Sequence, residues 1–208
     1  MAAAIAAINS DDVLTQNEGV ESVIQIGAAA VPELLRVLEG GGMQRMQAMY
    51  ALSEIGDTRA AAAFRAGLSD GDDKVRAYAA RGLAAIGDPQ AQAAAIATLN
   101  DAADKLHADI TPSVRTLGAM GLKVVPAVLE LLLSEDAMTR LRAERVLAAI
   151  LAAQHGAVAG RGFPSPKAEQ AMRADWSANG DYDYSAVPGA RRASVEKWRQ
   201  WLARKEKR

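Results

Sequence analysis

Side chains that could bind a charged ligand recur at one position along the chain. The position lies five residues before the last apolar residue of each predicted second helix, on the side opposite to its buried stripe. Its occupants are Glu21, Tyr50, Arg81, Arg115 and Arg145. Arginines that gather beside tyrosines can steer and hold an acidic partner. Three neighbours, Lys74, Tyr78 and Arg142, lie on the same side. The pattern therefore predicts a partner-binding surface made of Tyr50, Lys74, Tyr78, Arg81, Arg115, Arg142 and Arg145.

The same side of the early helices is acidic rather than basic. Its neighbouring residues there are Glu18, Gln25, Gln47 and Glu54, so the predicted surface runs from acidic to basic along the chain. The basic part predicts an acidic peptide or another anionic ligand as the partner. Arginines on a solvated helix face can also serve solubility alone, and the sequence leaves both interpretations open.

Catalytic and metal-binding groups are scarce. The chain has no cysteine, which excludes disulfides, thiolate metal sites and thiol nucleophiles. Its two histidines, His107 and His155, fall in predicted loops, where a single imidazole is more often solvated than ligating. The glycines at 40–42 lack the lysine and the preceding strand of a phosphate-binding loop. We therefore expect no enzymatic activity, no cofactor and no metal.

Charge and hydropathy limit the classes of partner. The net charge is −1 at pH 7, whereas general nucleic-acid binding depends on neutralising many phosphates. The apolar stretch 2–8 is far shorter than the roughly 20 residues of a membrane span, and it follows no basic residue. We expect a protein partner rather than nucleic acid or a membrane, and a cytoplasmic location. A signal peptide removed before this numbering begins is an open alternative.

The helices that must position these residues follow a repeat. The segment 73–88 reads as an amphipathic helix that ends in Ile-Gly. The ending also occurs at 26–27 and 55–56, as Met-Gly at 120–121, and as Ile150 without its glycine, at intervals of 29, 31, 34 and 30 residues. Such periods are typical of helical arrays. We predict an array over residues 1–153, with the longest interval lengthened by a loose segment near 100–110.

The chain changes character after the array. Glycines and prolines between 156 and 166 end the regular pattern, so residues 154–208 are predicted to form a Gly/Pro linker and a helical C-terminal cap. The apolar stripe of the last helix consists of Val195, Trp198, Trp201 and Leu202. Solenoids need a terminal unit that covers their last apolar face, and we favour this role. The alternatives are a partner contact through Trp198 and Trp201, or a basic tether to a membrane or nucleic acid.

The predicted helix at 73–88 and the residue before it match the consensus of a known repeat. Its residues are Asp72, Asp73, Val75, Arg76, Ala79, Ala80, Leu83, Ile86, Gly87 and Asp88. This pattern resembles HEAT-like repeats of the short bacterial type that is also found in phycobilin lyase subunits. Arg45 and Arg140 repeat the arginine ten residues before the terminal isoleucine, while Gln16 and Ile110 occupy its place in two other units. We interpret these arginines as structural partners of turn acids such as Asp70, Asp72 or Asp136.

The resemblance implies a fold and a class of function. The fold is all-α: a right-handed α-solenoid of about five HEAT-like helix pairs with a helical C-terminal cap, in which the second helix of each pair lines the concave face. The implied function is a non-enzymatic scaffold or adaptor that binds another protein through that face. The alternative is a lyase-like or accessory subunit of an enzyme complex. Enzymes of this fold add groups that the sequence lacks, such as repeated His-Glu pairs or a broadly basic groove.

Overall fold

The regular secondary structure of the described residues is helical. The computed structural model describes residues 1–10, 12–103, 106–205 and 207, and its elements are α-helices with three short 3₁₀ segments between them. Strand geometry in these ranges is limited to one isolated bridge between Val158 and Gly162. The prediction of an all-α fold is confirmed.

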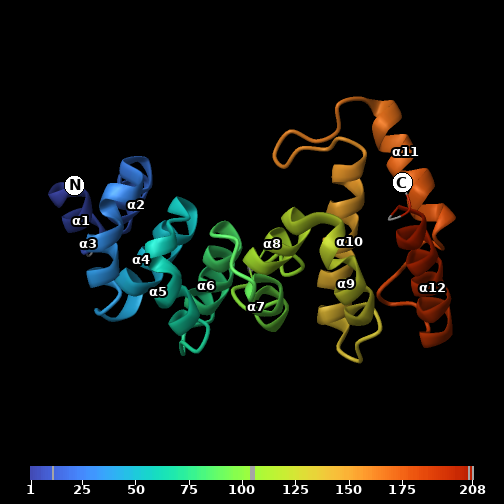
Figure 1. The fold of residues 1–208 in the computed structure, drawn as a ribbon, viewed down its shortest axis with the longest axis horizontal. Helices are drawn as coiled ribbons and strands as arrows, with labels where there is room; N and C mark the ends of the chain where they lie inside the picture. Colours follow the sequence, from blue (N-terminus) through green and yellow to red (C-terminus); the bar gives the residue numbers. More distant parts are fainter. Residues whose placement is uncertain (11, 104–105, 206, 208) are drawn as a thin grey trace. The chain divides into compact units, whose positions relative to one another are not determined.

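The chain divides into two compact units, residues 1–102 and 103–208, and each is described by itself (Figure 1). Unit 1 contains α1 (Ala2–Ile8), α2 (Val13–Ile26), α3 (Val31–Val37), α4 (Gly42–Ile55), α5 (Ala61–Gly67), α6 (Asp73–Ala85) and α7 (Ala91–Ala97). Unit 2 contains α8 (Pro112–Met120), α9 (Val125–Leu131), α10 (Ala137–Gln154), α11 (Pro166–Ala178) and α12 (Pro188–Lys205). The predicted boundary at 153 therefore falls inside a compact unit, because the C-terminal helices pack on the preceding pair.

Successive helices form the expected pairs. In unit 1, α1 packs on α2, α3 on α4 and α5 on α6, while the second helices α2, α4 and α6 contact one another in that order. In unit 2, α10 contacts both α8 and α9. The helices α2, α4, α6 and α10 are thus each held by their own first helix and by a neighbouring second helix, as in stacked helical repeats.

Capping residues explain where the helices begin and end. Asp12, Thr111 and Asp136 each accept the backbone N–H three residues further on, which satisfies a donor that the helix itself leaves unpaired. Asp12 is therefore the cap of α2. Gly56 ends α4 with a φ of 64°, a conformation that favours glycine.

The positions predicted to face the core are buried. The residues at the position three before each helix end have no exposed surface: Val23, Leu52, Leu83, Leu117 and Leu147. The small residues one turn earlier are also buried and are Gly19, Ala48, Ala79, Ser113 and Ala143. This burial leaves the opposite side of each second helix available for other contacts.

Close packing inside the third pair depends on Gly82. Phe64 of α5 is fully buried, and its ring lies over Gly82 of α6, where an added Cβ would be 2.3 Å from ring atom Cε1. A side chain fits there only if the ring or a helix moves. Gly82 therefore sets how closely α5 approaches α6.

Replacing Gly82 by alanine should destabilise the protein, because overpacking against Phe64 outweighs the gain of roughly 1 kcal/mol in helix propensity. We expect a net loss of about 1 kcal/mol in the free energy of unfolding, measured by urea unfolding followed by circular dichroism. Gly189→Ala is the control, because a Cβ at that position in α12 meets nothing within 4 Å. Equal stability of the two variants would contradict this account of the α5–α6 packing.

A tryptophan cluster closes the C-terminal end of unit 2. Trp198 of α12 is fully buried, and its ring centroid lies 5.3 Å from Trp176 and 5.2 Å from Trp201. The helix packs on α9, where Arg199 forms an ion pair with Glu130 at 2.7 Å. Figure 1 shows α11 and α12 alongside α9 and α10. The tail thus covers the apolar surface of the last helix pair.

The loop before α12 is fastened to the same pair. The Tyr182 hydroxyl donates to the Leu132 carbonyl at 2.5 Å, and burial raises the pKa of this phenol to about 12. The alternative that Trp198 and Trp201 contact a partner is wrong for this fold, because their exposed fractions are 0% and 4%. Their burial supports the capping role, with Arg192 and Lys197 exposed on the outer side of α12.

Trp198→Ala should lower the free energy of unfolding by roughly 3 to 5 kcal/mol, because it leaves a cavity at the centre of the cluster. We also expect association of the variant, measured by light scattering, because the surface of α9 becomes more accessible. Arg192→Ala, on the exposed side of the same helix, should change stability by less than about 0.5 kcal/mol. A Trp198→Ala protein that unfolds at the wild-type urea concentration would rule out the capping role.

Candidate protein-binding face

The candidate site in unit 1 is the side of α2, α4 and α6 that is not buried against the first helices. Its positions follow one another by turns of the helix and are Leu14, Glu18, Glu21, Gln25, Met43, Gln47, Tyr50, Glu54, Lys74, Tyr78, Arg81 and Ala85. We call this set the second-helix face. It is continuous because α2 contacts α4 and α4 contacts α6. Gln47 is its buried member: its Nε2 donates to Gln16 Oε1 across the first junction at 3.1 Å.

Four residues at the second junction form what we call the tyrosine cluster: Tyr50, Glu54, Tyr78 and Arg81. The two tyrosine rings are 5.1 Å apart between centroids and are tilted by 57°. The Arg81 guanidinium lies 5.8 Å from the centroid of the Tyr50 ring and forms an ion pair with Glu54. All four side chains are half-buried, so each presents part of its surface to solvent.

The predicted basic surface is therefore less positive than its sequence indicates. Within unit 1, the charge of Arg81 is neutralised by Glu54. Lys74 is exposed and pairs with none of the described carboxylates in this unit. The structure thus brings Tyr50, Tyr78 and Arg81 together and places Lys74 one turn from Tyr78 along α6.

In unit 2, the arginines of the predicted surface have mostly internal roles. Arg145 of α10 pairs with Asp109 at 2.6 Å and approaches Glu144 at 3.5 Å. The hydrogen bond from Arg145 lowers the pKa of the Asp109 carboxyl. Arg115 of α8 is exposed and is the member of this set in unit 2 that the structure leaves on the surface.

The predicted surface position of Arg142 is wrong. The residue is only 5% exposed, and its Nε and Nη2 donate to the Ala108 carbonyl at 3.0 and 2.8 Å. Burial lowers the pKa of the guanidinium. The cause is the segment 106–110, which belongs to the longest interval between repeats and lies over this side of α10.

A separate set of arginines joins consecutive repeats, and we call it the arginine clamp: Arg45, Arg76 and Arg140. Arg45 pairs with Asp70 at 3.2 Å. Arg76 pairs with both oxygens of Asp101 at 2.8 and 3.0 Å and donates to the carbonyls of Asp70 and Gly71. In both repeats, the carboxylate lies 25 residues after the arginine. The interpretation of these arginines as structural is supported by these contacts.

Arg140 makes the equivalent contacts at the end of the array. It donates to the carbonyls of Ser134 and Glu135 at 2.8 and 2.7 Å, as Arg76 does to its own turn. In place of a carboxylate from a following repeat, the Tyr184 carbonyl accepts its Nε–H at 2.8 Å. The Tyr184 N–H in turn donates to Glu144 at 3.0 Å, and burial raises the pKa of that carboxyl. The tail thus supplies backbone groups where another repeat would supply an acid.

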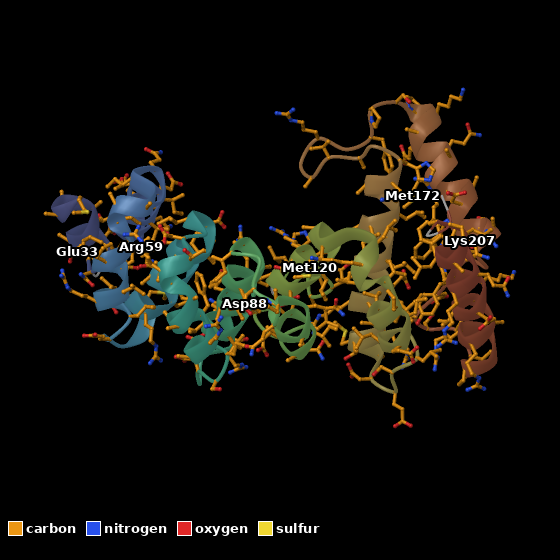
Figure 2. All side chains as sticks on the ribbon, in the orientation of Figure 1. Glu33, Arg59, Asp88, Met120, Met172 and Lys207 are labelled. Carbon is orange, nitrogen blue, oxygen red and sulfur yellow. The ribbon has the colours of Figure 1, made fainter. Side chains whose placement is uncertain are left out.

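The clamp has partners that the sequence patterns did not single out. Asp101 and Tyr184 are two such partners. The 25 residues between Arg45 and Asp70 recur between Arg76 and Asp101, and this spacing could have indicated Asp101. The suggested partners Asp72 and Asp136 instead cap their own helices. Two further arginines join neighbouring repeats: Arg65 pairs with Asp88 at 2.5 Å, and Arg59 donates to the Ala28 carbonyl at 2.5 Å. Figure 2 labels Asp88 and Arg59.

Arg76→Lys should lower the free energy of unfolding by about 1 to 2 kcal/mol, since an ammonium cannot bridge both carboxylate oxygens and two carbonyls. Urea unfolding is the measurement. Arg36→Lys is the matched control, because Arg36 forms an exposed pair with Glu33 within one helix, and such pairs contribute little. Equal effects of the two substitutions would show that the clamp is no stronger than a surface ion pair.

The described parts of the chain contain no cluster of three or more histidine, cysteine or acidic residues that could hold a metal ion. No helix in them is both long and apolar enough to span a membrane. His155 lies beside Asp175, with Nε2 and Oδ2 3.0 Å apart, and so links the end of α10 to α11.

Comparisons with known proteins agree with the repeat assignment. The family model for HEAT repeats matches residues 42–111, the stretch that contains the tyrosine cluster and the clamps of Arg45 and Arg76. No curated protein matches the chain. A crystal structure of an engineered protein from the Northeast Structural Genomics Consortium is similar at 18% identity, over 96% of this chain and 95% of that chain, with a TM-score of 0.40. The match to HEAT repeats thus covers α4 to α7 and agrees with the paired helices of that stretch.

Proposed function

We propose that the chain is a non-enzymatic scaffold or adaptor that binds another protein through the second-helix face of unit 1. The observation that carries the proposal is the tyrosine cluster, in which large side chains from two repeats are fixed against one another while remaining half-exposed. HEAT repeats commonly serve as protein-interaction scaffolds.

The chemistry of the cluster suits a protein interface. Tyrosine and arginine are enriched among the residues that contribute most to binding between proteins. Because Arg81 is already held by Glu54 and by the ring of Tyr50, a partner would immobilise few additional rotamers on this side of the interface. The cluster also lies away from the leucine stripe that stabilises the repeat.

Photo-crosslinking from the cluster tests the proposal. A benzophenone amino acid in place of Tyr78 should capture a defined protein in cells of the source organism, identified by mass spectrometry. The same amino acid at Gln170, exposed on α11, is the control position. The captured protein, once purified, should bind the unmodified chain directly, as measured by calorimetry. Capture from both positions alike, or no direct binding, would contradict the proposal.

Arg81→Glu should weaken that binding by at least about tenfold, because it places a second carboxylate beside Glu54 and removes the guanidinium from the Tyr50 ring. Arg36→Glu is matched to it, since it also places a carboxylate beside a former glutamate partner, but on α3. Both variants should fold with stability close to wild type. If the captured partner is an enzyme whose turnover requires the chain, the accessory-subunit alternative would replace the scaffold role.

A further inference from the structure

We infer that the partner docks through a basic, partly apolar segment that lies across α2 and α4 on the second-helix face, an assignment that rests on the proposed function. The charged residues of that face differ in whether they form ion pairs. Arg81 and Glu54 neutralise one another. Glu18 and Glu21 of α2 are exposed and form no ion pair with any described residue of unit 1. Two unpaired carboxylates are therefore the charges on the α2 side of the tyrosine cluster.

The net charge of unit 1 also favours a basic partner. Residues 1–102 contain thirteen acidic and seven basic residues, a net charge of −6. Such a surface attracts a basic segment over distances of about a Debye length and repels an acidic one. The acidic peptide expected from the arginine pattern fits this unit poorly, because its arginine on the face is already paired. Charge complementarity thus favours a basic occupant.

Exposed apolar side chains lie on the same two helices. Leu14 of α2 is 73% exposed and Met43 of α4 is 50% exposed. They occupy equivalent positions, each twelve residues before the terminal isoleucine of its helix. Glu18 and Glu21 follow Leu14 by about one and two turns of α2. A segment with an apolar residue near Leu14 and Met43 and with arginine or lysine nearby would satisfy both features.

The tyrosine cluster supplies the third feature of the site. Arg81 over the Tyr50 ring shows that this surface accommodates a guanidinium against a tyrosine. Glu21 occupies the position on α2 that Tyr50 occupies on α4, so the acidic residues and the rings lie on adjacent helices of one face. The occupant is therefore a cationic segment rather than a merely apolar one.

Synthetic peptides test the assignment. One short fluorescent peptide carries leucines and several arginines, and its twin carries glutamates in place of the arginines. The arginine peptide should bind the full-length protein, with an affinity that falls at high salt, as measured by fluorescence anisotropy. The glutamate twin should not bind. Binding of the twin as tightly as the arginine peptide, or of neither peptide, would overturn the basic assignment.

Charge reversal locates the site. The double variant Glu18→Lys/Glu21→Lys should bind the arginine peptide about tenfold more weakly or worse. The matched control is Glu33→Lys/Glu39→Lys, which changes the charge of unit 1 equally but on and just after α3 (Figure 2 labels Glu33). The control should change affinity by no more than about threefold. Equal losses in both variants, each with a wild-type circular dichroism spectrum, would show attraction by net charge alone and overturn the site.

Two further outcomes separate this inference from the proposed function. If the protein captured through position 78 binds unchanged to the Glu18→Lys/Glu21→Lys variant, the scaffold role stands and the basic-segment assignment fails. A second copy of the chain is another source of a basic segment, since α12 exposes Arg192 and Lys197. Self-association at low salt, measured by sedimentation velocity and abolished by the same double variant, would assign the face to that second copy instead of a different protein.

Discussion

The arginine clamp is the interaction on which the rest of the repeat array depends. Arg76 and Arg140 hold the turns before their own helices, and Arg45 and Arg76 bind a carboxylate supplied by the following repeat. In a solenoid every repeat contacts only its neighbours, so stability is largely a sum of such local junctions. A buried leucine stripe brings two helices together without fixing their relative translation. The directional contacts of a guanidinium fix that translation.

The register that the clamp imposes also builds the candidate site. Because α4 packs against α6, Tyr50 meets Tyr78 while Arg81 meets Glu54, and each pair joins repeat positions about one helical turn apart. The same proximity neutralises the arginine that the sequence indicated as a free cation. On α2, Glu18 and Glu21 have no such partner in the described part of unit 1. Binding chemistry on this face is therefore set by which charges the repeat leaves unpaired.

At the C-terminal end of the array, backbone groups of the tail take the place of a following repeat. The Tyr184 carbonyl occupies the place of the carboxylate that a following repeat would bring to Arg140, and Glu144 holds the Tyr184 N–H. The tryptophans then cover the apolar side of the last pair. The tail thus hydrogen-bonds Arg140 and covers the apolar surface beside it, as a terminal unit of a solenoid must.

The helices, their pairing and the buried stripe could be predicted from the sequence, because they follow from local periodicity, caps and a repeat of nearly constant length. The repeat also predicted structural roles for Arg45, Arg76 and Arg140. Which outward side chains form ion pairs depends on the folded structure, because pairs such as Arg81 with Glu54 join residues 27 positions apart. Likewise, an irregular segment of the longest interval buried Arg142 under the Ala108 carbonyl. Periodicity predicts the direction of a side chain from its helix, but what lies over it depends on contacts between segments distant in sequence.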